Sequence, residues 1–304
     1  MSTLMNSTGA WTSLLLPGAL LLALGGFLAV QTGLVSPPSI RLAGAIDAPP
    51  TVTVPARAHS YRLPGEYQRG GRTIDAPLLT DTQAAIEIMT YQVSATDYAR
   101  CVADGACDKA RPRRNGAGNV PVTGVNFTDA EAYAAWLSAS TGSHWRLPTV
   151  AEWTFAAGSK AADPALGVEG DNPADRWIAF YDKQAALGRN ALATPQRLGS
   201  SGVNEFGVAD LAETVWEWTS TCDSRTRLDA KGAEISRLES CGVRLLEGRH
   251  RTAMSFFVRD ALAGGCSAGT PPDNLGFRLV REPSWLAGAA SALGIPFLLR
   301  PPNT

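Results

Sequence analysis

The side chains best suited to chemistry gather in one stretch near the end of the 304-residue chain. His250 can give or take a proton near neutral pH, and Cys266 can act as a nucleophile if neighbouring positive charge lowers the pKa of its thiol. With Arg259, they are the candidate catalytic residues. The candidate substrate-binding residues of the same stretch are Arg249, Arg251 and Ser255. The alternative is that the arginines pair with acidic neighbours and that Cys266 is an inert thiol.

A glutamate between two tryptophans marks a second candidate site, Glu217 in the motif NEFGVADLAETVWEWT of residues 204–219. Each large aromatic side chain buries about 150–250 Å², so Trp216 and Trp218 are expected in a core. A carboxylate beside that core must be paired or bound to a cation. Glu217 is therefore either salt-bridged within a tryptophan-rich strand or a ligand of a structural cation.

The five cysteines are Cys101, Cys107, Cys222, Cys241 and Cys266, and their spacings match no zinc pattern. Cys101 and Cys107 flank a glycine-containing turn, and Cys222 and Cys241 bracket a polar loop. These pairs predict two disulfides in an oxidising compartment. Cys266 is left as the odd thiol.

The charge balance disfavours nucleic acid as a partner, because 27 basic and 28 acidic residues give a net charge of −1. Residues 14–35 carry no charge and are long enough to cross a bilayer core of about 30 Å. No basic residue precedes this run, so an uncleaved transmembrane signal-anchor is favoured over a cleavable signal peptide. The main domain is expected on the oxidising side of the membrane.

The chain divides by composition into five segments. A short tail (1–13) and the anchor (14–35) precede a linker rich in proline and alanine (36–60). The globular domain is expected over 61–282, and an apolar tail covers 283–304. Its uncharged part, 285–299, is too short for a membrane span and is expected to lie at a surface beside the anchor.

Capping patterns predict three helices in the domain. The first begins after Ser94, the second after a capping box of Thr128 and Glu131, and the third after a capping box of Thr149 and Glu152.

Strands are expected at 84–91, 242–246 and 275–280, whereas residues 158–200 read as loop. The basic loop KARPRRNGAGN (109–119) can hold a phosphate or an acidic partner, although exposed arginines are more often only solvated.

Four motifs in order carry a family resemblance: PVTGVNFTDAEAYAAWL, GSHWRLPTVAEWTFAAG, NEFGVADLAETVWEWT and PPDNLGFRLV. Over about residues 61–282 the chain resembles the formylglycine-generating enzyme family, also called sulfatase-modifying factors. The resemblance implies an irregular α+β fold related to C-type lectins, with low regular secondary structure and bound calcium.

In that family the turn before the second tryptophan wraps a structural calcium ion, using backbone carbonyls and the glutamate. The resemblance therefore makes Glu217 a Ca²⁺ ligand candidate. Glu213 and Thr214 replace the glycine and asparagine that the family has in this turn. A second family calcium site would use Asn190, where the match is poor.

The chain departs from the family where the chemistry lies. Oxidase members carry two active-site cysteines, but the corresponding segment LLEGRHRTAMSFFVRD has none. Copper(I) oxidation of that type needs two thiolates, so a family-type copper site is not expected. Iron-dependent relatives need a histidine cluster, and the three histidines are His59, His144 and His250. The sequence assigns no catalytic metal.

Three functions remain open. The resemblance favours a membrane-anchored accessory factor that binds a periplasmic client protein or peptide. It would be a single-pass protein of a bacterial inner membrane, similar to family members that mature nitrite reductase or tailor siderophores. The first alternative is an oxidoreductase or peptide-modifying enzyme that uses Cys266 and His250 in the same groove. The second is a lectin-like binding module with contacts at Trp177, Tyr181 and loop 109–114.

Overall fold

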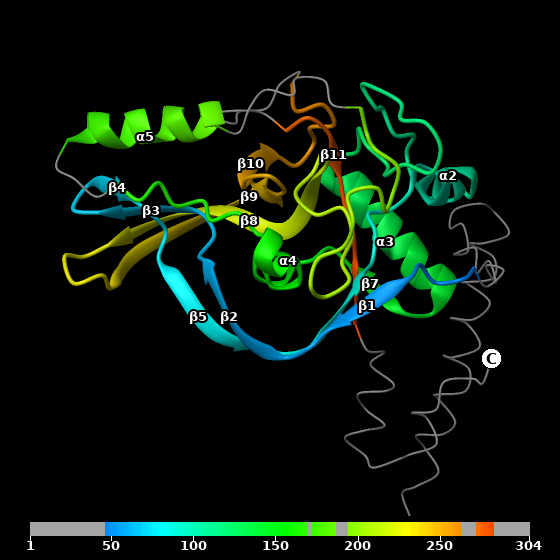
Figure 1. Ribbon diagram of the computed structural model, residues 1–304, viewed down its shortest axis with the longest axis horizontal. Helices are drawn as coiled ribbons and strands as arrows, with labels where there is room; N and C mark the ends of the chain where they lie inside the picture. The colour runs from blue at the N-terminus through cyan, green and yellow to red at the C-terminus, as the bar shows by residue number, and fades with distance from the viewer. Residues whose placement is uncertain (1–45, 169–171, 187–193, 263–271, 283–304) are drawn as a thin grey trace, which may run out of the picture. The chain divides into compact units, whose positions relative to one another are not determined.

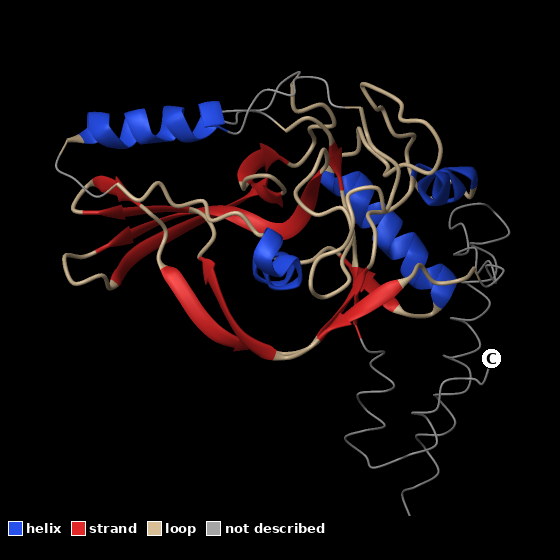
Figure 2. Cartoon of the chain, in the orientation of Figure 1, coloured by secondary structure: helices blue, strands red, loops and turns tan. Residues whose placement is uncertain are grey.

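The computed structural model of the chain describes residues 46–168, 172–186, 194–262 and 272–282. They form a mixed α+β fold of short helices and three sheets (Figures 1 and 2). No helix among these residues combines the length and hydropathy that a bilayer crossing needs. The predicted anchor (14–35), the apolar tail (283–304), Asn190 and Cys266 all lie outside the described residues.

The first sheet joins segments from the start, the middle and the end of the domain. Its four strands pair antiparallel in the order β1 (Thr51–Val54), β6 (Ile86–Met89), β12 (Val280–Glu282) and β7 (His144–Arg146). Val280 lies opposite Ile88 on one side and Arg146 on the other. The last described strand, β12, therefore lies between two earlier strands of the sheet.

The predicted start of the domain at residue 61 is too late, since β1 and most of β2 (Arg57–Arg62) lie in the predicted linker. Val54 is fully buried. The prolines that suggested a linker, Pro50 and Pro55, flank β1 rather than interrupt it, as expected of residues that cannot donate to a ladder. β2 pairs antiparallel with β5 (Leu78–Gln83).

The largest sheet is built on a long hairpin of β8 (Trp216–Leu228) and β9 (Glu234–Glu247). In Figure 1 this hairpin, drawn in yellow, extends away from helices α2 and α3. β9 also pairs antiparallel with β10 (Thr252–Ser255). β8 pairs in parallel with β11 (Leu275–Gly276) and with β3 (Glu66–Arg69). β3 in turn pairs antiparallel with β4 (Arg72–Ile74). The predicted polar loop between Cys222 and Cys241 is thus most of a β-hairpin, and the predicted strand at 242–246 is one end of β9.

Two of the three predicted helix starts are confirmed. Helix α2 (Ala95–Ala103) begins after Ser94, whose hydroxyl accepts the backbone N–H of Asp97 at 2.9 Å. Helix α4 (Val150–Ala157) begins after Thr149 with the predicted capping box to Glu152. A 3₁₀ turn follows at Gly158–Lys160.

Helix α3 (Phe127–Thr141) starts earlier than predicted, because its capping box is formed by Asn126 and Asp129 rather than by Thr128 and Glu131. Asn126 lies two residues before Thr128, whose hydroxyl donates to the Asn126 side chain at 2.9 Å. The asparagine therefore takes the position that the threonine was expected to fill.

A helix, α5 (Pro173–Ala186), occupies part of the stretch predicted to be loop. Its start has a recognisable signal, since the Asn172 side chain accepts the backbone N–H of Ala174 at 3.1 Å and proline suits the first helical position. Arg176 pairs with Asp75 at 2.8 Å and so ties α5 to the segment after β4.

The predicted strand at 275–280 is split into β11 and β12 by three fully buried residues, Phe277, Arg278 and Leu279. The strand predicted at 84–91 is shorter, as β6. Two apolar clusters make up the core, one around Trp216, Trp218 and Phe277 and the other around Trp153 and Phe155. An arginine at the centre of such a core requires a partner of opposite charge.

Candidate functional site

Glu217 is that partner, and its carboxylate is fully occupied. Oε2 accepts the Nε of Arg278 at 2.6 Å and the indole N–H of Trp153 at 2.8 Å. Oε1 accepts Nη2 of Arg278 at 2.7 Å and the side-chain amide of Gln92 at 2.9 Å. The side chains of Arg278 and Glu217 are 0% and 1% exposed. The salt-bridge alternative for Glu217 is thus the arrangement that the structure contains.

Arg278 uses its remaining donors on backbone carbonyls. Nη1 donates to the carbonyls of Met89 and Thr90 at 3.3 and 3.1 Å, and Nη2 to that of Ala209 at 2.9 Å. One side chain therefore joins three segments of the chain around Glu217. We call Glu217, Arg278, Gln92 and Trp153 the buried ion-pair centre.

The buried ion-pair centre does not fit a calcium ion. Calcium takes six to eight oxygen ligands, but the carboxylate of Glu217 already accepts four hydrogen bonds from nitrogen donors. An ion at either oxygen would also meet the positive charge of Arg278. Asn190, the other calcium candidate, lies outside the described residues.

The turn before β8 is instead held by hydrogen bonds. Asp210 and Ala212 adopt positive φ angles of 55° and 58°. The Asp210 carboxylate accepts the backbone N–H groups of Gly199 and Ser201. The carbonyl of Thr214, one of the two family substitutions, accepts the side-chain amide of Asn274 at 2.8 Å.

The predicted substrate-binding residue Arg251 is buried in an ion pair with Glu247 at 2.5 Å. Burial raises the pKa of Glu247, and Arg251 opposes that rise. Nη1 of Arg251 also donates to the carbonyl of Arg62 at 2.9 Å. Its guanidinium is therefore committed to the protein itself.

Arg259, a predicted catalytic residue, makes a two-pronged ion pair with Asp129, with both N–O distances at 2.6 Å. Asp108 lies 3.3 Å from the same guanidinium. The hydrogen bond to Asp129 raises the pKa of Arg259 against the effect of burial. Asp129 caps α3, so this arginine anchors the segment after β10 to the start of that helix.

The other predicted residues of this stretch lie apart from these pairs. The ring of His250 packs edge-to-face on Trp216, with 5.3 Å between centroids, and its carbonyl accepts the Trp216 indole N–H at 3.0 Å. Burial raises the pKa of Asp273, and the nearby Arg249 opposes that rise. Ser255 lies opposite Val243 on β9.

Both predicted disulfides are confirmed. Cys101 pairs with Cys107 and Cys222 with Cys241, with Cα–Cα distances of 5.3 and 4.5 Å. Glu239 approaches the second pair, and together they are the one three-residue ligand cluster found in the described ranges. Its two sulfurs are bonded to each other. Four of the five cysteines are therefore in disulfides.

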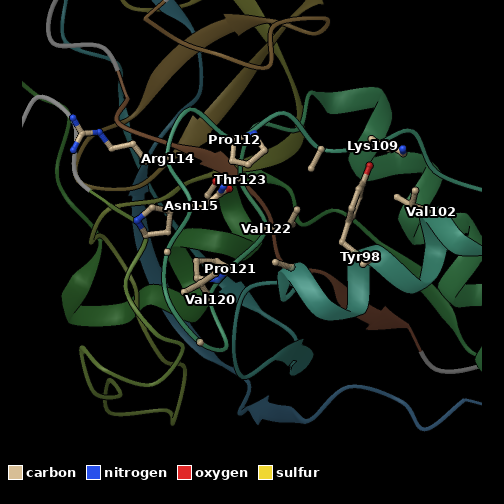
Figure 3. Close-up of a pocket in the computed structure, with 16 residues that line it drawn as sticks. Tyr98, Val102, Lys109, Pro112, Arg114, Asn115, Val120, Pro121, Val122 and Thr123 are labelled. Carbon is tan, nitrogen blue, oxygen red and sulfur yellow. The ribbon is translucent and has the colours of Figure 1, made fainter.

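A roomy pocket lies elsewhere, between α2 and the basic loop (Figure 3). Its volume is about 510 Å³. Figure 3 shows Tyr98, Val102 and Lys109 on one side and Arg114 and Asn115 on the other. We call this cavity the α2 pocket.

The loop that forms the α2 pocket is fixed by backbone contacts. The N–H of Arg111 donates to the carbonyl of Gly124 at 2.9 Å, and that of Leu198 to the carbonyl of Asn119 at 2.9 Å. Gly124 has a φ of 71°, and a Cβ there would lie 2.2 Å from the Arg111 carbonyl. Only glycine allows the two backbones to approach so closely.

Sequence reasoning singled out the basic loop but missed Arg278 and the pocket. Arg278 had a signal, since it is a lone charge in the apolar run LGFRLV, as Glu217 is a lone charge between tryptophans. The pocket had none, because its walls come from α2, from the basic loop, from residues 120–123 and from Pro195.

Comparison with known proteins places the whole domain. The family model described as the sulfatase-modifying factor enzyme 1-like domain matches residues 46–283. The chain is 37% identical over 108 residues to the formylglycine-generating enzyme of Mycobacterium tuberculosis, a match that covers 33% of each chain. It is also 37% identical over 108 residues to the hercynine oxygenase of Mycolicibacterium smegmatis, covering 34% of this chain and 22% of that protein. The match thus spans a third or less of these two relatives.

The solved structure of PvdO from Pseudomonas aeruginosa is 23% identical, with a TM-score of 0.49 over 79% of this chain and 97% of that chain. The two curated relatives are named for different reactions, so membership alone does not fix an activity. Because the family model matches well over half of the chain, the protein belongs to the sulfatase-modifying factor family, the family of formylglycine-generating enzymes.

Proposed function

We propose that this protein is an accessory member of its family, which binds a client protein or peptide and does not carry out two-thiolate copper chemistry. The observation that carries the proposal is the use of the cysteines. Four are in disulfides, which leaves Cys266 as the one remaining thiol of the chain. A copper(I) ion held between two thiolates has no second ligand here.

The pairing of the arginines supports the same proposal. Arg251 and Arg259 were candidates for substrate contact and catalysis, but each is held by a carboxylate of the protein. The α2 pocket, in contrast, is open and bordered by basic residues. Binding is therefore proposed at the pocket rather than at the segment that holds Arg251 and Arg259.

The proposed location is the periplasmic side of a bacterial inner membrane, with residues 14–35 as a single-pass anchor. The disulfides support an oxidising compartment. The proposed client is a periplasmic redox enzyme or a precursor that it uses, and the proposed fold is the irregular, lectin-like variant of the family. Calcium at Glu217 is not part of this proposal, because Arg278 uses that carboxylate.

Site-specific photo-crosslinking of the full chain in its own cells tests the proposal. A benzoylphenylalanine at position 115 lies at the side of the α2 pocket, and one at position 227 lies on the exposed side of β8 as a control. We expect a discrete crosslinked partner from position 115 alone. Equal or absent crosslinking at both positions would contradict a client-binding role at this pocket.

A metal and thiol assay tests the chemical half of the proposal. We expect one titratable thiol per unfolded, unreduced chain and no stoichiometric copper(I) bound. Tight copper(I) binding that disappears in Cys266→Ser would support the enzyme alternative instead. Full cellular activity of Cys266→Ser and His250→Ala would remove that alternative.

The lectin-like binding alternative is favoured by one observation on α5. Trp177 and Tyr181 are 68% and 55% exposed, and their rings lie 5.0 Å apart. Stacked or edge-to-face aromatic pairs in water are suited to contact with a partner. Glycan and peptide arrays with the wild type and Trp177→Ala would separate this function from client binding at the α2 pocket.

A further inference from the structure

We propose that the α2 pocket binds a carboxylate that is carried on an apolar group. The inference rests on the proposed function, because the bound group would belong to the client or to a precursor. Two sources share this chemistry, an acidic peptide segment and a free carboxylated molecule. The experiment below has an arm for each.

The size and walls of the pocket require an apolar body. A volume of about 510 Å³ lies within the range of about 300–1,000 Å³ that is usual for small-ligand sites. Val102, Pro112 and Val122 contribute apolar walls. Tyr98 contributes its ring, because its hydroxyl already donates to the carbonyl of Asp108 at 3.0 Å. A strongly hydrated ligand would lose its bound water on entering, and these apolar walls would offer no hydrogen bonds in exchange.

The charges at the rim require an anion. Lys109 and Arg114 both line the pocket and are exposed. Within the described ranges neither side chain has an ion-pair partner, whereas their neighbour Arg113 pairs with Asp260 at 3.0 Å. The planar fork of a guanidinium matches a carboxylate, and a lysine adds a point charge. A carboxylate at either side of the rim would therefore meet a cation that no other described group neutralises.

The loop is ready for a ligand before one arrives. Backbone hydrogen bonds fix it at Arg111 and Asn119, and the close approach at Gly124 leaves it no room to shift inward. The Cys101–Cys107 disulfide ties the chain just before Lys109. Binding to a fixed loop does not have to offset the entropy of ordering that loop.

Matched probes test this assignment by calorimetry on the full chain in a zwitterionic detergent, with empty micelles as background. The free-molecule arm compares 4-phenylbutyrate with 4-phenylbutylamine and with acetate. The peptide arm compares acetyl-Leu-Glu-Val-Asp-amide with acetyl-Leu-Lys-Val-Lys-amide. The variants are the double change Lys109→Gln and Arg114→Gln, the pocket-filling Ala99→Phe, and Arg227→Gln as a surface-charge control.

We expect the apolar acids to bind with a Kd in about the millimolar range, and their amine or lysine counterparts and acetate to bind at least about tenfold more weakly. The double charge variant should weaken binding about fivefold, Ala99→Phe should abolish it, and Arg227→Gln should leave it unchanged. The tighter of the two acids identifies the source.

Equal binding of phenylbutyrate and phenylbutylamine would overturn the proposal, as would an equal effect of Arg227→Gln or no binding of either acid up to about 10 mM. Crosslinking to a client at position 115 can persist in each of these cases. Failure of the ligand class is therefore distinguishable from failure of the accessory role.

Discussion

The buried ion-pair centre and the α2 pocket place arginines in opposite situations. Arg278 is fully buried, and each of its nitrogens donates to a carboxylate or a carbonyl. Arg114 is exposed and has no ion-pair partner among the residues the structure describes. Charge that holds the fold together is thus separate from charge that is open to a ligand.

The two situations differ in what a lost charge leaves behind. A buried carboxylate without its partner stays in a medium where it interacts strongly with its surroundings and is poorly solvated. When an exposed arginine is removed by substitution, water fills its place and no charged partner is left behind. The comparison predicts a steep decline in the effect of charge removal from the core to the loop.

The largest effect is expected for Arg278→Met. Removing the arginine leaves Glu217 buried and unpaired, so the free energy of unfolding should fall by about 3–5 kcal/mol. Urea denaturation measures the loss. The double variant Glu217→Leu and Arg278→Met, which removes both charges, should recover part of it. A double variant less stable than Arg278→Met would contradict an ion pair.

Calcium sharpens the same comparison. If Glu217 serves Arg278, then Glu217→Gln should lose the same free energy of unfolding in EDTA as in excess calcium. A loss seen only with calcium present would identify Glu217 as a ligand, as the family resemblance implied.

A smaller effect is expected from the disulfide beside the pocket. Replacing Cys101 and Cys107 by serine should lower the free energy of unfolding by about 2 kcal/mol, because the short loop gains chain entropy when unfolded. It should also weaken binding of 4-phenylbutyrate, since the chain before Lys109 is released. Stability lost with binding unchanged would show that the loop is held by its backbone contacts alone.

His59 lies between the two extremes, half-buried on β2 with its Nε2 3.1 Å from the Thr154 hydroxyl. Burial, and then the charge of Arg57, lower the pKa of His59 below its ordinary value. The folded state therefore binds this proton less readily than the unfolded state. The stability that results is present above about pH 6.5 and is lost as the pH falls towards the folded-state pKa.

Denaturation of the wild type and of His59→Gln at pH 7.5 and pH 5.5 measures this effect. The wild type should lose more stability than the variant, by less than about 1 kcal/mol because solvent screens the ring. A variant with the same pH dependence as the wild type would exclude His59 as the source.

The smallest effect on stability is expected at the loop. Arg114→Gln should change the free energy of unfolding by no more than about 0.5 kcal/mol. A loss comparable to that of Arg278→Met would mean that the loop charge is structural after all.

Interactions between residues close together in the sequence could be predicted, and those between distant residues could not. Ser94 and the pair of Thr149 and Glu152 were read correctly because capping joins residues three apart. Thr128 was misread because Asn126 competes for the same role, and the sequence ranks neither. The disulfides were correct, but the hairpin between Cys222 and Cys241 was not, because most of β9 is exposed on both faces and lacks the alternation of a half-buried strand.

The candidate site was harder because its parts come from distant segments. The basic loop could be named from composition alone, yet its pocket depends on α2 and on Pro195. Arg251 and Arg259 looked reactive in isolation, and their carboxylates lie at Glu247, close by on β9, and at Asp129, far away in the sequence. A charged residue shows its type in the sequence but not its partner.

The position of Arg278 and β12 also sets the order in which the molecule can be completed. β12 lies between β6 and β7, and Arg278 supplies the counter-charge of Glu217. Ribosomal synthesis delivers these residues after nearly all the rest of the domain. Contacts that span so much sequence form slowly, so a nascent chain stopped before residue 275 should remain without a stable core and open to proteases. The domain therefore reaches its final form only as a finished polypeptide.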